Sequence, residues 1–252
     1  MSGFAVLLKK EIRENWRTGR LPVVAVIFLL FGLASPVIAR YTPEIVRLAA
    51  GPIAIPLPTP TTRDAVAQLI KNLNQVGVLT AVLLAMGSVA SEKESGTAGF
   101  VLTKPVSRLA FLAAKFCGLG LTMAVAVAVC GLAAYAYTDI LFAPLPAPGY
   151  VLACLAMLLI LLEIAAITFL GSVLMRTSIP AAGIGVAAVV IAGILASVPR
   201  VGDFTPFGLN QMARDLALGQ VRMEWQWQVG ANLGVLALAL GASWVVFRRQ
   251  EL

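Results

Sequence analysis

Histidine is absent from this chain of 252 residues, and charged residues make up only 12% of it. Soluble domains carry about 25% charged residues, which argues against a large soluble core here. The lack of imidazole removes the commonest general base and the commonest metal ligand from any catalytic scheme. The three cysteines, Cys117, Cys130 and Cys154, match no zinc or redox spacing. We therefore expect them to be small, buried apolar residues.

The sequence also lacks the G-x-x-x-x-G-K-[ST] motif that cradles nucleotide phosphates. Gly118 and Gly120 lie in an apolar run and are not followed by Gly-Lys. A membrane-bound hydrolase is disfavoured too, because no paired acids or metal cluster occur at depth. We therefore expect no enzyme activity, cofactor or metal in this chain. Any energy for work must come from another chain or from an ion gradient.

Long apolar runs dominate the chain, which is 60% hydrophobic and has a mean hydropathy of +0.91. A transmembrane helix needs roughly 20 apolar residues. The runs predict an all-α, polytopic membrane protein in which residues 1–252 form one transmembrane domain of six helices. The expected spans are 21–39, 73–90, 116–137, 151–175, 179–198 and 229–247.

The distribution of Lys and Arg predicts the orientation of these spans. With the N-terminus inside, 12 of the 19 Lys and Arg residues fall on the cytoplasmic side. This bias favours a multi-pass protein with both termini in the cytoplasm. The net charge of +7 then reflects orientation in the lipid bilayer, and we expect no nucleic-acid partner.

Two longer segments are predicted to be external, 40–72 and 199–228. The first is rich in proline and is expected to end in a short helix at 63–73. The second contains a predicted amphipathic helix at 210–218 and two tryptophans typical of a membrane interface. A third external segment, 138–150, is predicted to be a short proline-rich turn.

The N-terminal stretch, 1–20, has the pattern of an amphipathic helix. Its apolar residues recur at helical spacing and its charged residues occupy the opposite face. The apolar face is formed by Phe4, Leu7, Leu8, Ile12 and Trp16. Such a helix lies in the plane of the interface as an elbow before the first span. It either only anchors that span or also touches a cytoplasmic partner.

The charged segment 91–115 stands between two apolar spans. Ser91 and Glu94 have capping-box spacing, and Gly96 and Thr97 allow a turn. A short helix through 101–102 is expected to end before a proline, after which Ser107 would cap the third span. A solvated turn is the simpler interpretation. The apolar tip at 100–102 favours a docking knob, because a plain loop does not need to expose Phe and Leu.

This segment resembles the loop between the second and third spans of type-2 ABC transporter permeases. The matching positions are Glu92, Glu94, Gly96, Thr97, Pro105, Ser107, Arg108 and Lys115. The resemblance extends to the Lys10-Glu11 pair in the first helix and to Thr205-Pro206-Phe207 in the last external segment.

The resemblance implies a permease subunit of an ABC exporter in a prokaryotic cytoplasmic membrane. Its partners would be a second permease subunit, in a homo- or heterodimer, and two copies of an ATPase subunit that holds ATP and Mg. The segment 91–115 would then be a coupling loop seated on the ATPase, with the turn at 176–178 as a weaker second contact. The implied coupling residues are Glu92, Glu94, Gly96, Thr97, Phe100, Val101, Leu102, Pro105, Ser107 and Arg108.

Glu163 is the one carboxylate expected at mid-depth in a span. A charge there is costly and should face the bundle interior or a water-filled cavity. Its carboxyl group would bind a substrate or exchange a proton. Alternatively, it would join two helices through a hydrogen bond to Asn232 or Thr122. Glu163 also supports the alternative of an ion-coupled secondary transporter or channel. A structural scaffold is a further alternative.

Small residues recur at four-residue spacing in two of the predicted spans. This spacing permits close approach of helices. We expect packing within the subunit, with a dimer contact as the alternative. The residues are Gly120, Ala124, Ala128, Gly230, Gly234, Ala237 and Gly241.

Overall fold

The computed structural model describes residues 3–50, 58–97, 107–220 and 225–250, and all regular structure within these ranges is helical. The long helices are α2 (Arg20–Ala50), α7 (Arg108–Leu141), α8 (Ala147–Leu174), α9 (Ser178–Ala196) and α11 (Trp225–Arg249). The shorter ones are α1 (Gly3–Arg17), α3 (Thr62–Asn72), η1 (Leu73–Gly77), α4 (Val78–Met86), α5 (Ala90–Glu94), η2 (Gly202–Phe204), η3 (Pro206–Gly208) and α10 (Leu209–Ala217).

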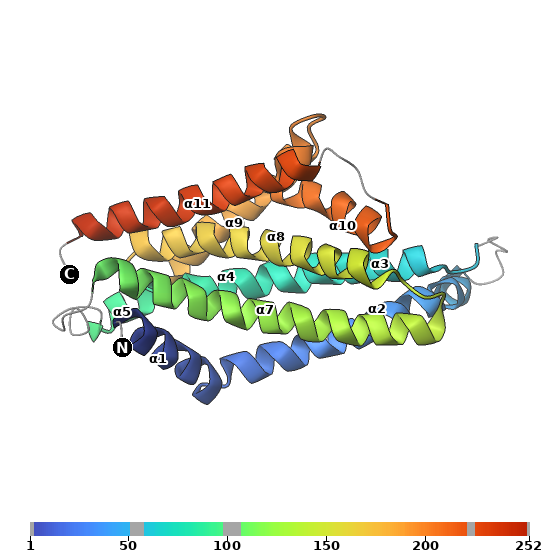
Figure 1. Cartoon of the computed structure of the whole chain (residues 1–252), viewed down its shortest axis with the longest axis horizontal. Coiled ribbons are helices and arrows are strands. Elements are labelled where there is room, and N and C mark those ends of the chain that lie inside the picture. Colours follow the sequence, from blue (N-terminus) through green and yellow to red (C-terminus); the bar gives the residue numbers. More distant parts are fainter. Residues whose placement is uncertain (1–2, 51–57, 98–106, 221–224, 251–252) are drawn as a thin grey trace.

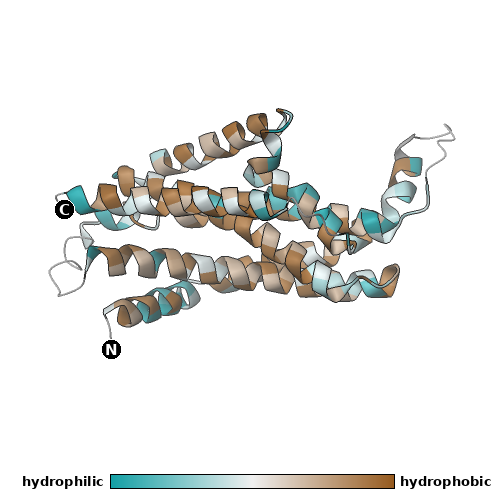
Figure 2. Cartoon of the chain, turned by 45° about the horizontal axis from the view of Figure 1, so that its top comes forward, coloured by the Kyte–Doolittle hydropathy of each residue, from teal (hydrophilic) through white to brown (hydrophobic). Residues whose placement is uncertain are grey.

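Within the described ranges, six helical stretches are long and apolar enough to cross a membrane. Five are single helices, and the second is the continuous run Thr62–Glu94 that includes the π-helical turn η1. The predicted all-α architecture with six spans is therefore confirmed. The middle of the bundle is mainly hydrophobic, and hydrophilic residues gather toward its two ends (Figure 2).

The two ends of the bundle carry different segments. Helix α1, α5, the start of α7 and the end of α11 lie at one end, which we call the terminal end because both termini are there (Figure 1). Helix α3 and the end of α2 lie at the opposite, distal end. The N-terminal helix, the charged segment and the C-terminus therefore share one end, as the predicted orientation requires.

Several helices extend beyond their predicted spans. Helix α2 continues to Ala50 with Pro36 and Pro43 inside it, 11 residues beyond the expected end of the first span at 39. A proline removes only one ladder bond, and transmembrane helices tolerate it. Likewise, α7 begins eight residues before the expected 116 and shortens the predicted turn at 138–150. Hydropathy locates the apolar stretch of a helix but not the polar turns that extend it. The expected short helices at 63–73 and 210–218 are confirmed as α3 and α10.

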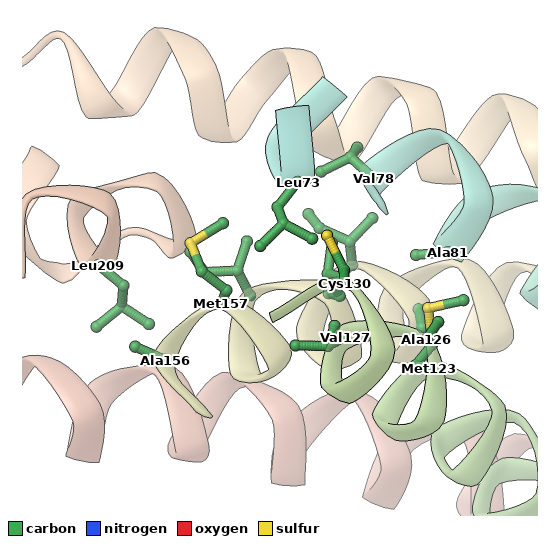
Figure 3. Close-up of a cluster of buried hydrophobic side chains, with 14 of the residues drawn as sticks. Leu73, Val78, Ala81, Met123, Ala126, Val127, Cys130, Ala156, Met157 and Leu209 are labelled. Atoms are coloured by element: carbon green, nitrogen blue, oxygen red, sulfur yellow. The ribbon is translucent and has the colours of Figure 1, made fainter. Parts of the chain in front are cut away.

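Helix α8 is the centre of the packing. It contacts α4, α7, α9, α10 and α11, and its second half is buried on nearly every side. Figure 3 shows part of this core, where Met157 of α8 lies among side chains of α7, α10 and the second span. Of the cysteines, only Cys130 is buried as expected, whereas Cys154 is partly exposed and Cys117 lies on the surface of α7.

Small residues set the closest helix contacts, but not all of those predicted to do so. A Cβ atom on Gly120 would lie 3.5 Å from Leu162, an ordinary packing contact. A Cβ on Gly230, Gly234 or Gly241 would meet no described atom within 4 Å. The expectation that these three glycines pack within the subunit is therefore wrong, because that face of α11 points outward.

One tight contact of this kind joins α2 to α7 at Gly32. A Cβ there would lie 2.5 Å from the carbonyl oxygen of Cys130, a backbone atom that cannot rotate away. We expect Gly32→Ala to destabilise the protein by about 1–3 kcal/mol, the usual effect of overpacking. Thermal unfolding of the detergent-solubilised protein measures this. Gly193→Ala is the matched control, since a Cβ there meets nothing within 4 Å. Equal melting temperatures for the two variants would contradict this account of the α2–α7 contact.

Candidate coupling site at the terminal end

Helix α5, which lies inside the charged segment, is held by a hydroxyl from another span. The backbone N–H groups of Val89 and Ala90 donate to Oγ of Ser172 on α8, at 3.0 and 2.9 Å. Ser172 is fully buried and supplies the acceptor that the first turn of a helix needs. The predicted capping box is wrong, because α5 begins at Ala90 and Ser91 instead donates to the Gly87 carbonyl. The cap comes from a helix far away in sequence, so local spacing could not reveal it.

A second contact joins α5 to the ends of α8 and α11. Lys93 Nζ donates to the carbonyl oxygen of Val173, and Gln250 Nε2 donates to the same oxygen at 2.9 Å. This carbonyl lies in the last turn of α8, where carbonyl groups lack helical partners. Sequence reasoning missed Ser172 and Gln250, since neither residue has a motif or a charge.

A group of ionisable side chains, here called the charge cluster, joins α5 to α1 and α7. Lys115 of α7 lies at its centre, with Nζ at 2.8 Å from Glu92 Oε1 and at 3.3 Å from Glu11 Oε1. Lys10 completes it, with Nζ at 3.4 Å from Glu92 and 3.6 Å from both Glu11 and Glu14. One carboxylate of the charged segment is thus shared by cations from two other helices.

Burial makes this cluster more than a set of surface ion pairs. The side chain of Lys115 is only 5% exposed, and its ammonium also lies 5.2 Å from the centre of the Phe111 ring. Removing one partner of a buried pair leaves an uncompensated charge, which costs about 3–5 kcal/mol. Partial burial acts to lower the pKa of Lys10, but the carboxylates of Glu92, Glu11 and Glu14 outweigh it and raise that pKa above the ordinary value. Lys10 therefore stays charged at neutral pH.

Helix α1 packs directly on α7 beside the charge cluster. Asn15 Nδ2 donates to Thr122 Oγ1 at 3.2 Å and to the Gly118 carbonyl at 3.4 Å. Gly118 permits this approach, because a Cβ there would lie 2.9 Å from Cβ of Glu11. The predicted elbow helix therefore exists, and it is attached to the third span as well as leading into the first.

Ser107 and Arg108, both predicted coupling residues, have internal partners. Ser107 Oγ accepts from the Ala110 N–H at 3.1 Å, which confirms the expected cap of the third span. The guanidinium of Arg108 donates to carbonyl oxygens at the end of α11, those of Phe247, Arg248 and Gln250, at 2.8–3.0 Å. A cation suits the negative end of a helix dipole. Arg108 thus fixes the C-terminal end of α11.

The remaining predicted coupling residues lie on the surface or outside the described ranges. Glu94, Gly96 and Thr97 are exposed, and Gly96 ends α5 in the left-handed conformation, with φ of 71°, that favours glycine. The structure does not describe the predicted helix through 101–102 or the residues Phe100, Val101, Leu102 and Pro105. Glu94 is therefore the carboxylate of this segment that faces solvent, whereas Glu92 points into the charge cluster.

Glu163 lies away from this site, within α8. It is 1% exposed, and its Oε2 atom has no hydrogen-bond partner in the described part of the chain. Neither predicted partner bonds to it: Thr122 donates to Gly118, and the Asn232 amide donates to Gln228.

The comparisons with known proteins agree with this architecture. A family model described as "ABC-2 family transporter protein" matches residues 5–202. The chain belongs to the ABC-2 transporter family. The matched region of this ABC-2 protein includes α1, the charge cluster and the predicted coupling segment.

One relative is the transmembrane protein YxlG of Bacillus subtilis (strain 168). The two sequences are 27% identical over 120 residues, a stretch that covers 46% of each chain. The chain thus spans about half the length of the curated relative it matches. The predicted family and the multi-pass membrane class are confirmed, and the individual coupling residues remain predictions.

The charge cluster generates a testable expectation. Lys115→Gln leaves Glu92 and Glu11 without their closest cation, so we expect α1 to detach from α7 more often. Limited trypsin digestion after Arg17 and Arg20 should then release α1 several times faster than in the wild type. Lys9→Gln is the control. Lys9 is an exposed cation on α1 and forms no ion pair with a described residue. Equal cleavage rates in the two variants would show that the cluster does not hold α1.

Proposed function

We propose that this chain is the permease subunit of an ATP-driven exporter, and that the segment around α5 receives the mechanical work of a separate ATPase. Family membership supports the general role. The observation that carries the proposal is the way α5 is attached, since its contacts lead to α1, α7, α8 and α11. A partner that displaces α5 therefore displaces four helices.

The path of this motion begins at Ser172. Because two α5 backbone groups bond to this hydroxyl, movement of α5 acts directly on α8. Helix α8 contacts five other helices of the bundle, so a tilt of α8 is transmitted to the whole interior. Such a bundle changes between two packed arrangements according to which one the bound partner favours.

The two carboxylates of the segment have different roles in this proposal. Glu94 is exposed and would pair with a cation on the ATPase, whereas Glu92 would transmit force through Lys115 and Lys10. The ATPase subunits, present in two copies, would hold ATP and Mg. A second permease subunit would complete the complex. Lys and Arg predominate in the sequence segments at the terminal end, which supports a cytoplasmic location for that end.

Substitution of these carboxylates separates docking from internal attachment. We expect Glu94→Gln to reduce co-purification of a co-expressed ATPase subunit by about tenfold, the effect of losing one charge-assisted hydrogen bond, with no change in melting temperature. Glu92→Gln should lower both association and melting temperature, because it breaks the buried ion pair. Glu44→Gln, an exposed carboxylate on α2 near the distal end, is the control. Unchanged co-purification of the ATPase subunit with Glu94→Gln would contradict the docking role of Glu94.

Glu163 favours a second candidate, an ion-coupled transporter. A carboxyl group that is 1% exposed and has an oxygen without a described partner is expensive to bury, which is typical of a group kept for function. In this alternative the carboxyl group takes up and releases a proton during transport. The ATP-driven proposal is preferred because α5 is attached to so many helices.

Stability measurements test whether Glu163 is structural. If the carboxyl group holds helices together, Glu163→Leu will destabilise the protein. If it is retained for function, removing the buried polar group should raise stability by about 1–3 kcal/mol. We expect the second result, measured as a higher melting temperature in detergent. Glu163→Gln is the matched variant: it keeps the polar group and should not show this gain. A lower melting temperature in Glu163→Leu would assign the acid to packing.

A further inference from the structure

A cavity of about 620 Å³ opens at the distal end, opposite the coupling site. Its walls come from α2, α3 with η1, the segment before α3, and α10 with η3. Its size falls in the range of about 300–1,000 Å³ that is usual for small-molecule sites. None of the functions proposed above uses this cavity.

Helix α3 supplies a polar wall because of its residue spacing. Asp64, Gln68, Lys71 and Gln75 line the cavity and recur at helical intervals of four, three and four residues. The opposite face of α3, which includes Leu69 and other apolar residues, is buried. An amphipathic helix would normally turn its polar face to bulk water. Here that face forms one wall of an open cavity, with Asp64 and Lys71 still exposed to solvent.

The π-helical turn η1 adds Asn74 to this wall. Asn74 Nδ2 donates to the Ile70 carbonyl at 3.0 Å and to Asn210 Oδ1 of α10 at 2.8 Å. The Oδ1 atom of Asn74 is buried and has no hydrogen-bond partner in the described ranges. A π-helical turn often marks a functional position.

Two cations face this cavity without acidic partners among the described residues. Lys71 comes from α3 and Arg214 from α10, and the ion pairs found in the described ranges all belong to the charge cluster at the terminal end. Asp64 is the one acid in the lining, and its Oδ2 atom accepts from the N–H and hydroxyl groups of Thr61, both at 2.8 Å. The cavity therefore offers positive charge to an incoming anion.

The remaining wall is apolar. It is formed by Ala39 and Pro43 of α2, by Pro58 and Pro60, and by Phe207. A purely ionic ligand would gain nothing from this surface, whereas an apolar chain would bury area against it. The two walls together suit a molecule with one charged end and one apolar end.

We propose that the distal cavity binds an amphipathic anion: an acyl or similar apolar chain that carries a phosphate group. The phosphate lies between Lys71 and Arg214, and the apolar chain lies along the proline wall. This chemistry is shared by anionic bilayer lipids and by exported amphiphiles. The inference goes beyond the proposed function, and its test uses neither ATP nor a partner subunit. Its failure would leave the proposed function untouched.

The test measures binding of fluorescent lysophosphatidylglycerol to the full chain in phosphatidylcholine nanodiscs by anisotropy, with empty discs as background. We expect Lys71→Gln and Arg214→Gln each to weaken binding about tenfold, as expected for loss of one charge-assisted contact. Lys71→Arg should retain binding. Arg63→Gln is the matched control, because Arg63 is an exposed cation on α3 that does not line the cavity.

Competing ligands define which features are recognised. Lysophosphatidylcholine lacks net charge, and glycerol 3-phosphate lacks the chain, so each should compete at least tenfold more weakly than unlabelled lysophosphatidylglycerol. Discs that also contain phosphatidylglycerol distinguish the sources: weaker probe binding there assigns the site to a bilayer lipid, and unchanged binding assigns it to a separate amphiphile. Equal affinity of Lys71→Gln, Arg214→Gln and Arg63→Gln, or equal competition by lysophosphatidylcholine, would overturn the proposal.

Discussion

A lipid bilayer offers no hydrogen bonds, so each polar group within it must find a partner inside the protein. The long helices satisfy their own backbones, but their ends do not, and the connecting segments need partners from elsewhere. At the terminal end of this protein these partners come from other spans. Ser172 of α8 receives the first N–H groups of α5, and Arg108 of α7 binds the last carbonyls of α11. The same bonds that complete the helix ends also join the helices to one another.

In the buried charge cluster, ionised side chains likewise find their partners on other helices. Lys115 is almost completely removed from solvent, and it is tolerated because two carboxylates from α1 and α5 compensate its charge. Helix α5, the described helix of the segment that resembles a coupling loop, is therefore a fixed part of the bundle. In mechanical terms this is useful, since a loosely attached loop would absorb displacement without passing it to the spans.

The distal end differs in electrostatic character. There, Lys71 and Arg214 face a cavity with no described acid paired to them, and a π-helical turn directs Asn74 to the same volume. The terminal end thus contains a buried charge cluster that is compensated internally, whereas Lys71 and Arg214 at the distal end are exposed and have no ion-pair partner among the described residues. This asymmetry fits a protein that receives work at one end and handles a molecule at the other.

Sequence reasoning succeeded where the signal was local. The capping role of Ser107 and the amphipathic pattern of α1 were readable from neighbouring residues. It failed where the signal came from a distant segment. The capping box at Ser91 had the right spacing, yet Ser172 took that role. The first span was expected to end at 39, before a proline-rich segment, but α2 continues to Ala50 because one missing hydrogen bond does not end a long helix.

The sequence by itself determined the class of the molecule, because apolar run length and charge content follow directly from what a bilayer permits. It also indicated the family, through residues close together in one loop. Only the tertiary structure decided what each charged residue does. Glu92 and Glu94 are two residues apart and chemically alike, but one is held between Lys115 and Lys10 while the other faces solvent. That difference depends on which helices pack beside α5. The spacing of neighbouring residues does not predict packing between segments that are distant in sequence.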